Sequence, residues 1–279
     1  MAYPQVSAPY GLKPINLIGG QVFSGSTRSL PIQYGYATDV GYGDFVKLVR
    51  GTIQRQAVST AGGAAGMVGI FLGCSFTNPV TKQKTFSQYW PSGTLAGDAV
   101  AIVCDDPDTV FKAVVCSSGT TVASGSIAMI GQNYQMIDNS VNLNTGDSTN
   151  ALLYSATLTT STFAMRAVGV VPETAIVTSA TGSSSSTTIT LTGSGLPIAI
   201  PAGTDVAYVA SNGQLIETGS FVTTAAAAGS TSVTMNAAIA VPGSVTAIPA
   251  SSTIVFTQYP EMLVKINFGI HEYYTATAV

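Results

Sequence analysis

Few residues in this chain could carry out catalysis, and its only histidine is His271, close to the C-terminal end. A hydrolase triad needs a histidine that accepts a proton from a serine or cysteine and is itself oriented by a carboxylate. No Gly-x-Ser-x-Gly motif precedes a helix-like segment, and no cysteine stands in a catalytic motif. We therefore expect His271 to be a packed or surface histidine, and we expect the chain not to be an enzyme.

The acidic residues cluster at Asp105, Asp106 and Asp108, around Pro107. Two carboxylates about 5 to 10 Å apart could serve a glycosidase, and a turn that joins Asp106 to Asp108 could form a weak calcium site. Asp beside Pro is also ordinary turn chemistry, and we favour turn formation or helix capping. There is no Walker loop, dinucleotide-binding glycine motif or Cys/His set with zinc spacing, so we expect no cofactor.

The three cysteines, Cys74, Cys104 and Cys116, are odd in number, have no CxxC spacing and lie in apolar segments. They are predicted to be buried free thiols, consistent with assembly in a reducing cytoplasm. The densest aromatic segment, residues 86–91, holds the only tryptophan. Its Tyr89 and Trp90 could stack on sugars, anchor an interface or pack in the core, and the sequence leaves these readings open.

Short runs rich in Val, Ile, Phe and Tyr, separated by glycines, are typical of many short strands, so we predict an all-β fold. Residues 44–49 and 53–58 should form a hairpin with a tight turn at Arg50-Gly51. No amphipathic helix of ordinary length stands out. The other predicted strands are residues 67–76, 99–104, 109–116, 126–130 and 164–171.

Residues 1–30 mix prolines and glycines with isolated apolar side chains and show no sustained period. We predict an extended N-terminal arm that anchors on a neighbouring subunit, with a disordered tail as the alternative. The candidate partner-binding residues are the apolar side chains of this arm: Tyr3, Tyr10, Leu12, Ile15 and Ile18.

The predicted main domain, residues 31–172 plus 258–279, is a small β-barrel or β-tulip-like unit. Residues 173–257 are rich in Ser and Thr and almost uncharged, and we predict an inserted β-sandwich-like domain with an internal duplication. Strands within the insertion are indicated by the alternating Ile189 and Leu191, and Val233 and Met235. After it, alternating Met262, Val264 and Ile266 predict a strand that returns to the main domain.

Composition limits the classes of partner. The 279 residues are 46% hydrophobic and only 8% charged, with a formal net charge of −3. Uncharged polar residues must therefore cover much of the surface, as they do in shell, fibre and adhesive proteins. The acidic balance disfavours nucleic acid. No run of about 20 apolar residues suits a membrane helix, so we expect a soluble, unexported protein without a membrane partner.

Several segments taken together resemble virion structural proteins of marine and freshwater tailed phages, including cyanophages. The segments are GLKPINLIGG (11–20), IQYGYAT (32–38), GDFVKL (43–48), VGIFLGC (68–74), FSQYWP (86–91), DDPDTVF (105–111) and LVKIN (263–267). The pair at 43–48 and 68–73 is also similar to the small β-barrel of phage head decoration proteins, which commonly sit as trimers on an icosahedral shell.

This resemblance implies a decoration or cement protein, made in the host cytoplasm, that binds the outside of the capsid. Its partners would be the major capsid protein, whose subunits it bridges, and itself, as a homotrimer. One alternative is the major capsid protein, which usually carries a long spine helix. Another is a tail or receptor-binding component that recognises host surface polysaccharide through a solvent-facing cluster at Tyr89 and Trp90.

Overall fold

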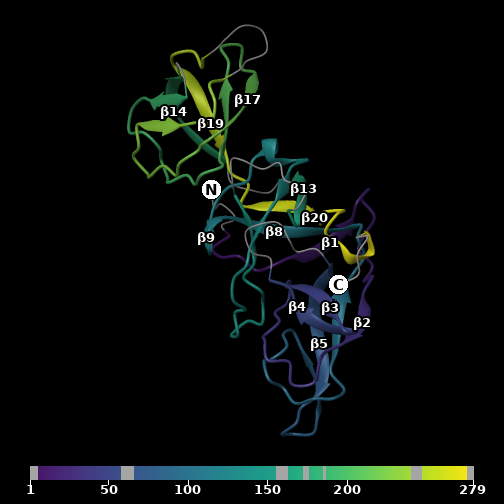
Figure 1. Cartoon of the computed structure of the whole chain (residues 1–279). Coiled ribbons are helices and arrows are strands. Elements are labelled where there is room, and N and C mark those ends of the chain that lie inside the picture. Colours follow the sequence, from purple (N-terminus) through teal and green to yellow (C-terminus); the bar gives the residue numbers. More distant parts are fainter. Residues whose placement is uncertain are drawn as a thin grey trace.

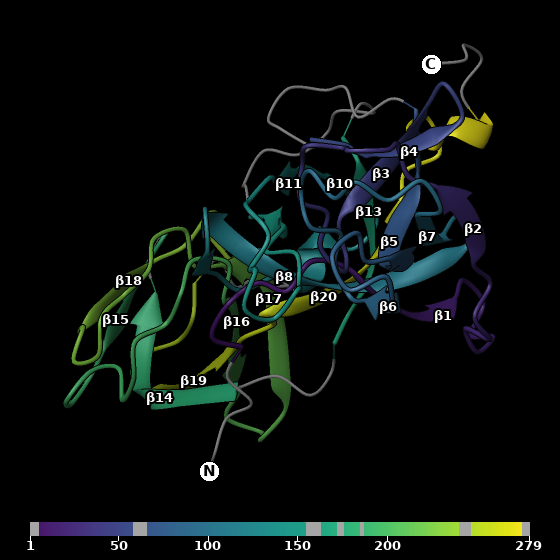
Figure 2. The same cartoon turned by 90° about the horizontal axis from the view of Figure 1, so that it is seen from below.

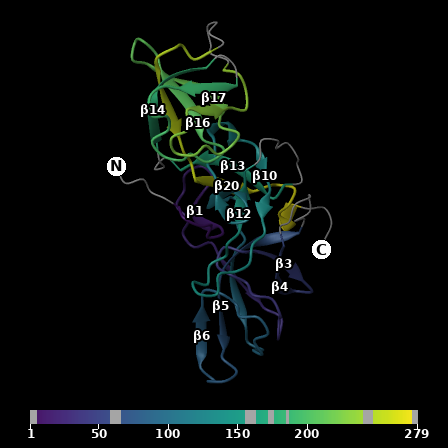
Figure 3. The same ribbon diagram turned by 90° about the vertical axis from the view of Figure 1, so that its left-hand side faces the viewer.

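The computed structural model describes residues 6–57, 66–154, 163–171, 176–184, 187–239 and 247–274. Within these ranges the regular secondary structure is nearly all strand, which confirms the predicted all-β class. Three sheets lie in three tiers, with the insertion at one end, a central sheet in the middle and a small barrel at the other end (Figures 1 and 3). Seen from below, the insertion lies to one side of the other two sheets (Figure 2).

The small barrel is a sheet in the order β2-β7-β5-β3-β4, with β6 added beside β5. A parallel bridge between Ile32 and Ile53 brings the two edges together, so the sheet nearly closes. Trp90, Phe71 and Phe76 lie in its interior. The strands are β2 (Arg28–Pro31), β3 (Phe45–Val49), β4 (Thr52–Arg55), β5 (Met67–Thr77), β6 (Lys84–Ser87) and β7 (Val100–Cys104).

The predicted hairpin at Arg50-Gly51 is present. Val49 pairs with Thr52, and the two turn residues both have positive φ, 51° at Arg50 and 80° at Gly51. A two-residue turn with this geometry matches the twist of the flanking strands, and glycine adopts it without strain. The turn therefore fixes the β3–β4 register, which places Arg55 at the end of the hairpin.

The central sheet has the order β10-β13-β20-β8-β12-β11, with β1 and β9 also paired to β8. Met262, Val264 and Ile266 of β20 are buried, which confirms the predicted return strand. Phe45 and Ile70 of the small barrel pack in the same core as Phe111. The strands are β1 (Lys13–Leu17), β8 (Thr109–Ser118), β9 (Thr121–Val122), β10 (Asn133–Tyr134), β11 (Met136–Ile137), β12 (Ala151–Leu153), β13 (Met165–Val170) and β20 (Glu261–Ile266).

The insertion is one curled sheet with its own core, in the order β17-β16-β19-β14-β15-β18. A bridge between Val222 and Met235 joins its two edges, so it is a barrel-like sheet where a sandwich was expected. The two Thr-alternating segments pair with each other, with Ile189 opposite Val233. The strands are β14 (Ile176–Ser184), β15 (Thr188–Leu191), β16 (Asp205–Val209), β17 (Leu215–Phe221), β18 (Ser232–Thr234) and β19 (Ser252–Thr257).

The prediction of an extended arm over residues 1–30 that anchors on a neighbouring subunit is wrong for its described part, which pairs within the chain's own sheets. Strand β1 pairs antiparallel with β8, and β2 pairs with β7. β1 has only five residues and is interrupted by a bulge between Pro14 and Asn16, so its apolar positions show no period of two. The segment is therefore an integral part of both sheets.

The predicted strand at residues 126–130 is also wrong. Residues Ile127–Met129 form the 3-10 helix η1, and the Ser126 side chain caps it by accepting a hydrogen bond from the Ala128 amide. The other helix is η2 (Glu272–Tyr274). These two three-residue turns are the only helices in the described ranges. The described residues therefore include no long spine helix and no helix that could cross a bilayer.

Candidate partner-binding surface

The first candidate surface is the β1 hairpin, which we define as residues 13–22. Strand β1 pairs with β8, and the chain then turns so that Val22 forms a bridge with Asn16. The Leu17 amide donates to the Gln21 carbonyl at 2.8 Å, and the Ile18 amide donates to the Asp108 carbonyl at 2.8 Å. These bonds hold the hairpin firmly on the central sheet.

The β1 hairpin exposes three apolar side chains: Ile15, Ile18 and Val22 have 39%, 49% and 80% of their surface accessible. Burying a fully exposed Ile or Val side chain contributes about 1.5 to 3 kcal/mol, and these partly exposed side chains contribute a share of that amount. Because the backbone beneath them is already ordered, little chain entropy is lost when a partner binds. The hairpin is therefore suited to a protein contact.

The other three residues predicted to bind a partner, Leu12, Tyr10 and Tyr3, do not belong to the β1 hairpin. Leu12 is completely buried in the core shared by the central sheet and the small barrel, so the expected partner contact at Leu12 is wrong. Tyr10 is half-buried; its hydroxyl donates to Glu261, and the Lys13 ammonium lies 4.5 Å from its ring centroid. Burial and the Glu261 carboxylate raise the pKa of Tyr10. Tyr3 lies outside the described residues.

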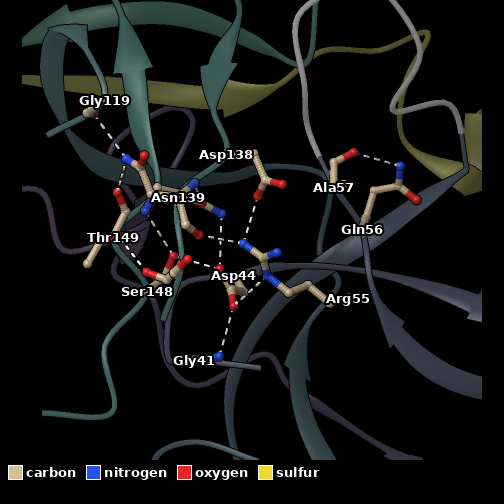
Figure 4. Close-up of polar contacts among 12 residues, drawn as sticks. Gly41, Asp44, Arg55, Gln56, Ala57, Gly119, Asp138, Asn139, Ser148 and Thr149 are labelled. Atoms are coloured by element: carbon tan, nitrogen blue, oxygen red, sulfur yellow. Dashed lines mark hydrogen bonds and ion pairs between the residues drawn. The ribbon is translucent and has the colours of Figure 1, made fainter. Parts of the chain in front are cut away.

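A buried polar network, which the sequence did not reveal, joins the small barrel to the loop of residues 138–150 (Figure 4). Asp44 is fully buried and accepts hydrogen bonds from Gly41 N, Ser148 Oγ and Asn150 Nδ2 at 2.8, 2.6 and 3.0 Å. Arg55 Nε lies 3.1 Å from Asp44 Oδ2. Burial raises the pKa of Asp44, while Arg55 and the hydrogen bonds oppose that shift.

Arg55 extends the same network. Its Nη2 donates to Asp138 Oδ1 and to the Asn139 carbonyl, both at 2.7 Å. Asn139 in turn donates to the Gly119 and Thr149 carbonyls. Every oxygen of the buried carboxylate thus has a donor, and the network ties four separate chain segments together. Its role is structural, and it positions the loop that ends at Asn150.

The acidic segment forms a turn between β7 and β8. Asp106 Oδ1 accepts from the Asp108 amide at 2.9 Å, and the Thr109 amide donates to the Asp106 carbonyl. Asp108 pairs with Lys265 at 2.7 Å, and Asp105 pairs with Arg28 and Tyr273. The Asp106 carboxylate therefore serves the turn, whereas the Asp108 carboxylate forms an ion pair with Lys265. No group of three or more metal-ligating side chains occurs in the described part of the chain.

His271 is packed in the protein. Its Nδ1 accepts from the Tyr273 amide at 3.3 Å, and its ring centroid lies 4.8 Å from that of Tyr273. Burial lowers the pKa of His271. The prediction for the cysteines is confirmed, since Cys74, Cys104 and Cys116 are buried free thiols. Burial raises the pKa of Cys74 to about 12, which leaves its thiol protonated and unreactive.

The aromatic segment divides between core and surface. Trp90 is fully buried in the small barrel, packs edge-on against Phe76 and donates from Nε1 to the Tyr36 carbonyl at 3.2 Å. Tyr89 is half-buried. The solvent-facing Tyr89–Trp90 cluster required by the receptor-binding alternative is therefore not present. Phe86, three residues before Tyr89, has 78% of its surface exposed.

The junction between the insertion and the central sheet contains a second buried carboxylate. Asp205 accepts from the Ser126 hydroxyl and, at 2.7 Å, from the Ile127 amide at the start of η1. Burial raises the pKa of Asp205 to about 6. The Ser124 amide donates to the Ala202 carbonyl at 3.0 Å beside it. These bonds orient the insertion on the central sheet.

Asp205 should make the stability of the fold depend on pH. Its folded-state pKa lies above the ordinary value of 3.8, so the folded protein keeps this proton to higher pH than the unfolded chain. This contribution to the free energy of unfolding therefore falls as pH rises from about 4 to about 6, by roughly 3 kcal/mol in total. In Asp205→Asn this slope should vanish.

Urea unfolding of both proteins at pH 4.5 and 7.5 measures the effect. We expect the stability of Asp205→Asn relative to the unsubstituted protein to increase between these pH values. Asp98→Asn is the control, because hydrogen bonds from Thr77 and Lys84 lower the pKa of Asp98, so its contribution is present at both pH values and is lost only on further acidification. Parallel pH profiles for Asp205→Asn and the unsubstituted protein would contradict the assignment.

Comparison with known proteins adds no relative: no family model, curated protein or solved structure matches this chain significantly.

Proposed function

We propose that this chain is a structural protein of a tailed-phage virion, which binds the outside of the head and bridges subunits of the major capsid protein. The observation that carries the proposal is the β1 hairpin, which presents Ile15, Ile18 and Val22 to solvent from a backbone anchored on the central sheet. The resemblance of seven segments to virion proteins supports the same role. A homotrimer on the shell is part of the proposal.

A cement protein needs rigid apolar contacts more than it needs chemistry. A contact of standard size, about 1,600 Å², repeated at many equivalent lattice positions resists expansion of the shell through avidity. The small barrel and the central sheet share one core, so force applied at the β1 hairpin passes into both sheets. The low content of charged residues suits a surface that packs against other subunits.

The test is binding to phage heads stripped of accessory proteins, scored by cosedimentation. Deleting residues 1–30 would remove β1 and β2 from their sheets, so point substitutions are required. We expect the triple variant Ile15→Ser, Ile18→Ser, Val22→Ser to bind at least 100-fold more weakly, because three partly exposed side chains lose about 1 kcal/mol each.

The control variant is Val80→Ser, Leu215→Ser, which removes exposed apolar side chains from the β5–β6 turn and the insertion. It should bind like the unsubstituted protein. Equal binding by the triple variant would rule out the hairpin as the contact, and failure of the unsubstituted protein to bind any form of the head would overturn the proposed function.

A further inference from the structure

A hollow of about 500 Å³ lies between β1, the β5–β6 hairpin and the loop that carries Asp147. Figure 3 shows β1 and the strands β5 and β6 that contribute to it. Its apolar lining residues include Phe86, Leu72 and Ile102. Its polar lining residues include Lys13, Gln88 and Asp147, together with Tyr42.

The polar groups of the hollow are held in place before any ligand binds. Gln88 Nε2 donates to Asp147 Oδ1 at 2.8 Å. The Tyr42 and Asp147 backbones form a parallel bridge, with the Ser148 amide donating to the Tyr42 carbonyl at 2.8 Å. Lys13 is steadied by the Tyr10 ring. Burial raises the pKa of Tyr42, and the nearby Asp147 carboxylate adds to that rise.

The chemistry of the lining narrows the class of ligand. Its charged groups are one lysine and one aspartate, so it has no net charge to attract a phosphate, and one carboxylate is too few for a metal ion. A lipid chain would exclude water from Lys13 and Asp147 without offering either of them a hydrogen bond. A sugar ring has an apolar C–H face and a rim of hydroxyls that both donate and accept, which matches a lining that contains apolar side chains as well as hydrogen-bonding groups.

We propose that this hollow binds a neutral saccharide of one or two rings, with a C–H face against Phe86 and hydroxyls at Asp147, Gln88 and Lys13. The Phe86 ring supplies the stacking surface, because 78% of this residue is accessible to solvent. A ligand can therefore reach the ring without the movement of a neighbouring side chain. The size fits the lower part of the usual range for small-molecule sites, about 300 to 1,000 Å³. The inference goes beyond the shell role and does not depend on it.

Saturation-transfer NMR on the purified full-length protein tests this site. The probes are neutral disaccharides built from glucose, galactose, mannose and N-acetylglucosamine. We expect at least one to receive saturation, with a Kd of about 1 mM, as is usual for a shallow site with few contacts. Phe86→Ala and Asp147→Ala should each weaken that binding roughly tenfold, while Phe86→Trp should preserve it.

Phe268→Ala is the matched control, because Phe268 is an exposed phenylalanine stacked on Tyr274 and does not line the hollow. It should leave saccharide binding unchanged, and thermal melts should show all four variants folded. The proposal is overturned if no disaccharide receives saturation. It is also overturned if neither Phe86→Ala nor Asp147→Ala changes the saturation transferred to the disaccharide. It is also overturned if Phe86→Ala weakens binding to phage heads while no saccharide binds, since the hollow would then hold a protein partner.

Discussion

Arg55→Ala is expected to lower the free energy of unfolding by about 3 to 5 kcal/mol at neutral pH, the usual effect of leaving one charge of a buried pair without its partner. Arg55 contacts Asp44 at 3.1 Å and Asp138 at 2.7 Å, and Asp44 is fully buried. Without the guanidinium, three neutral donors remain around the Asp44 carboxylate. The part of the loop that Arg55 bonds, at Asp138 and Asn139, should then loosen, while Ser148 and Asn150 still donate to Asp44.

The pH dependence of this loss identifies its cause. Burial already raises the pKa of Asp44, and removal of Arg55 should raise it further, so the folded variant favours the protonated carboxyl. Stability from a group with a raised folded-state pKa is present at low pH and lost as pH rises. The deficit of Arg55→Ala should therefore be smaller at pH 5 than at pH 8 in urea unfolding.

Lys84→Ala is the control for a surface pair. Lys84 lies 2.9 Å from Asp98, and both side chains are 46% exposed, so the expected loss is below about 1 kcal/mol. Arg55→Lys should recover part of the Arg55→Ala deficit, because it keeps the charge but loses the second set of contacts. An Arg55→Ala deficit as small as that of Lys84→Ala would show that Asp44 is not held by this pair.

Gly203→Ala is expected to loosen the insertion from the central sheet. A Cβ at Gly203 would lie 1.8 Å from the Ser124 carbonyl oxygen, and φ is +87° at this position. The steric overlap should lower the stability of the folded protein by roughly 1 to 3 kcal/mol. The left-handed backbone conformation should lower it further, by roughly 1 to 2 kcal/mol. The oxygen belongs to the backbone, so no side-chain rotation relieves the contact, and the junction must open.

Hydrogen exchange at the junction measures this opening. The Ser124 amide donates to Ala202 and the Ile127 amide donates to Asp205, so both should exchange faster in Gly203→Ala. Amides inside the insertion, such as those of β16 and β19, should keep their protection because the insertion has its own core. Gly213→Ala is the control, since it has φ +80° but nothing within 4 Å. Unchanged exchange at Ser124 and Ile127 would contradict the account of the junction.

The sequence predicted local features of the fold well. The tight turn at Arg50-Gly51 and the return strand at Met262, Val264 and Ile266 depend on residues adjacent in the chain, and both are present. The pattern failed where short elements depend on distant partners. β1 needs β8 to become a strand, and η1 needs the Asp205 carboxylate, 78 residues from Ile127, at its first amide.

The candidate sites were harder to predict because they depend on tertiary contacts. Leu12 and Ile15 look alike as isolated apolar residues, yet the former is buried in the core and the latter is exposed at a bulge. The residues around Asp44 in the sequence do not indicate that it is buried, because its partners Ser148 and Asn150 lie more than 100 residues away in the chain. A Gly-Asp pair at the start of a strand was the only signal available.

Cryo-electron microscopy of stripped phage heads repopulated with the purified protein tests the central claim most directly. Saturated density at fixed lattice positions, with the β1 hairpin at Ile15, Ile18 and Val22 against the major capsid protein, is the predicted result. Heads that remain bare at saturating protein, or that carry the protein with this hairpin facing solvent, would contradict it.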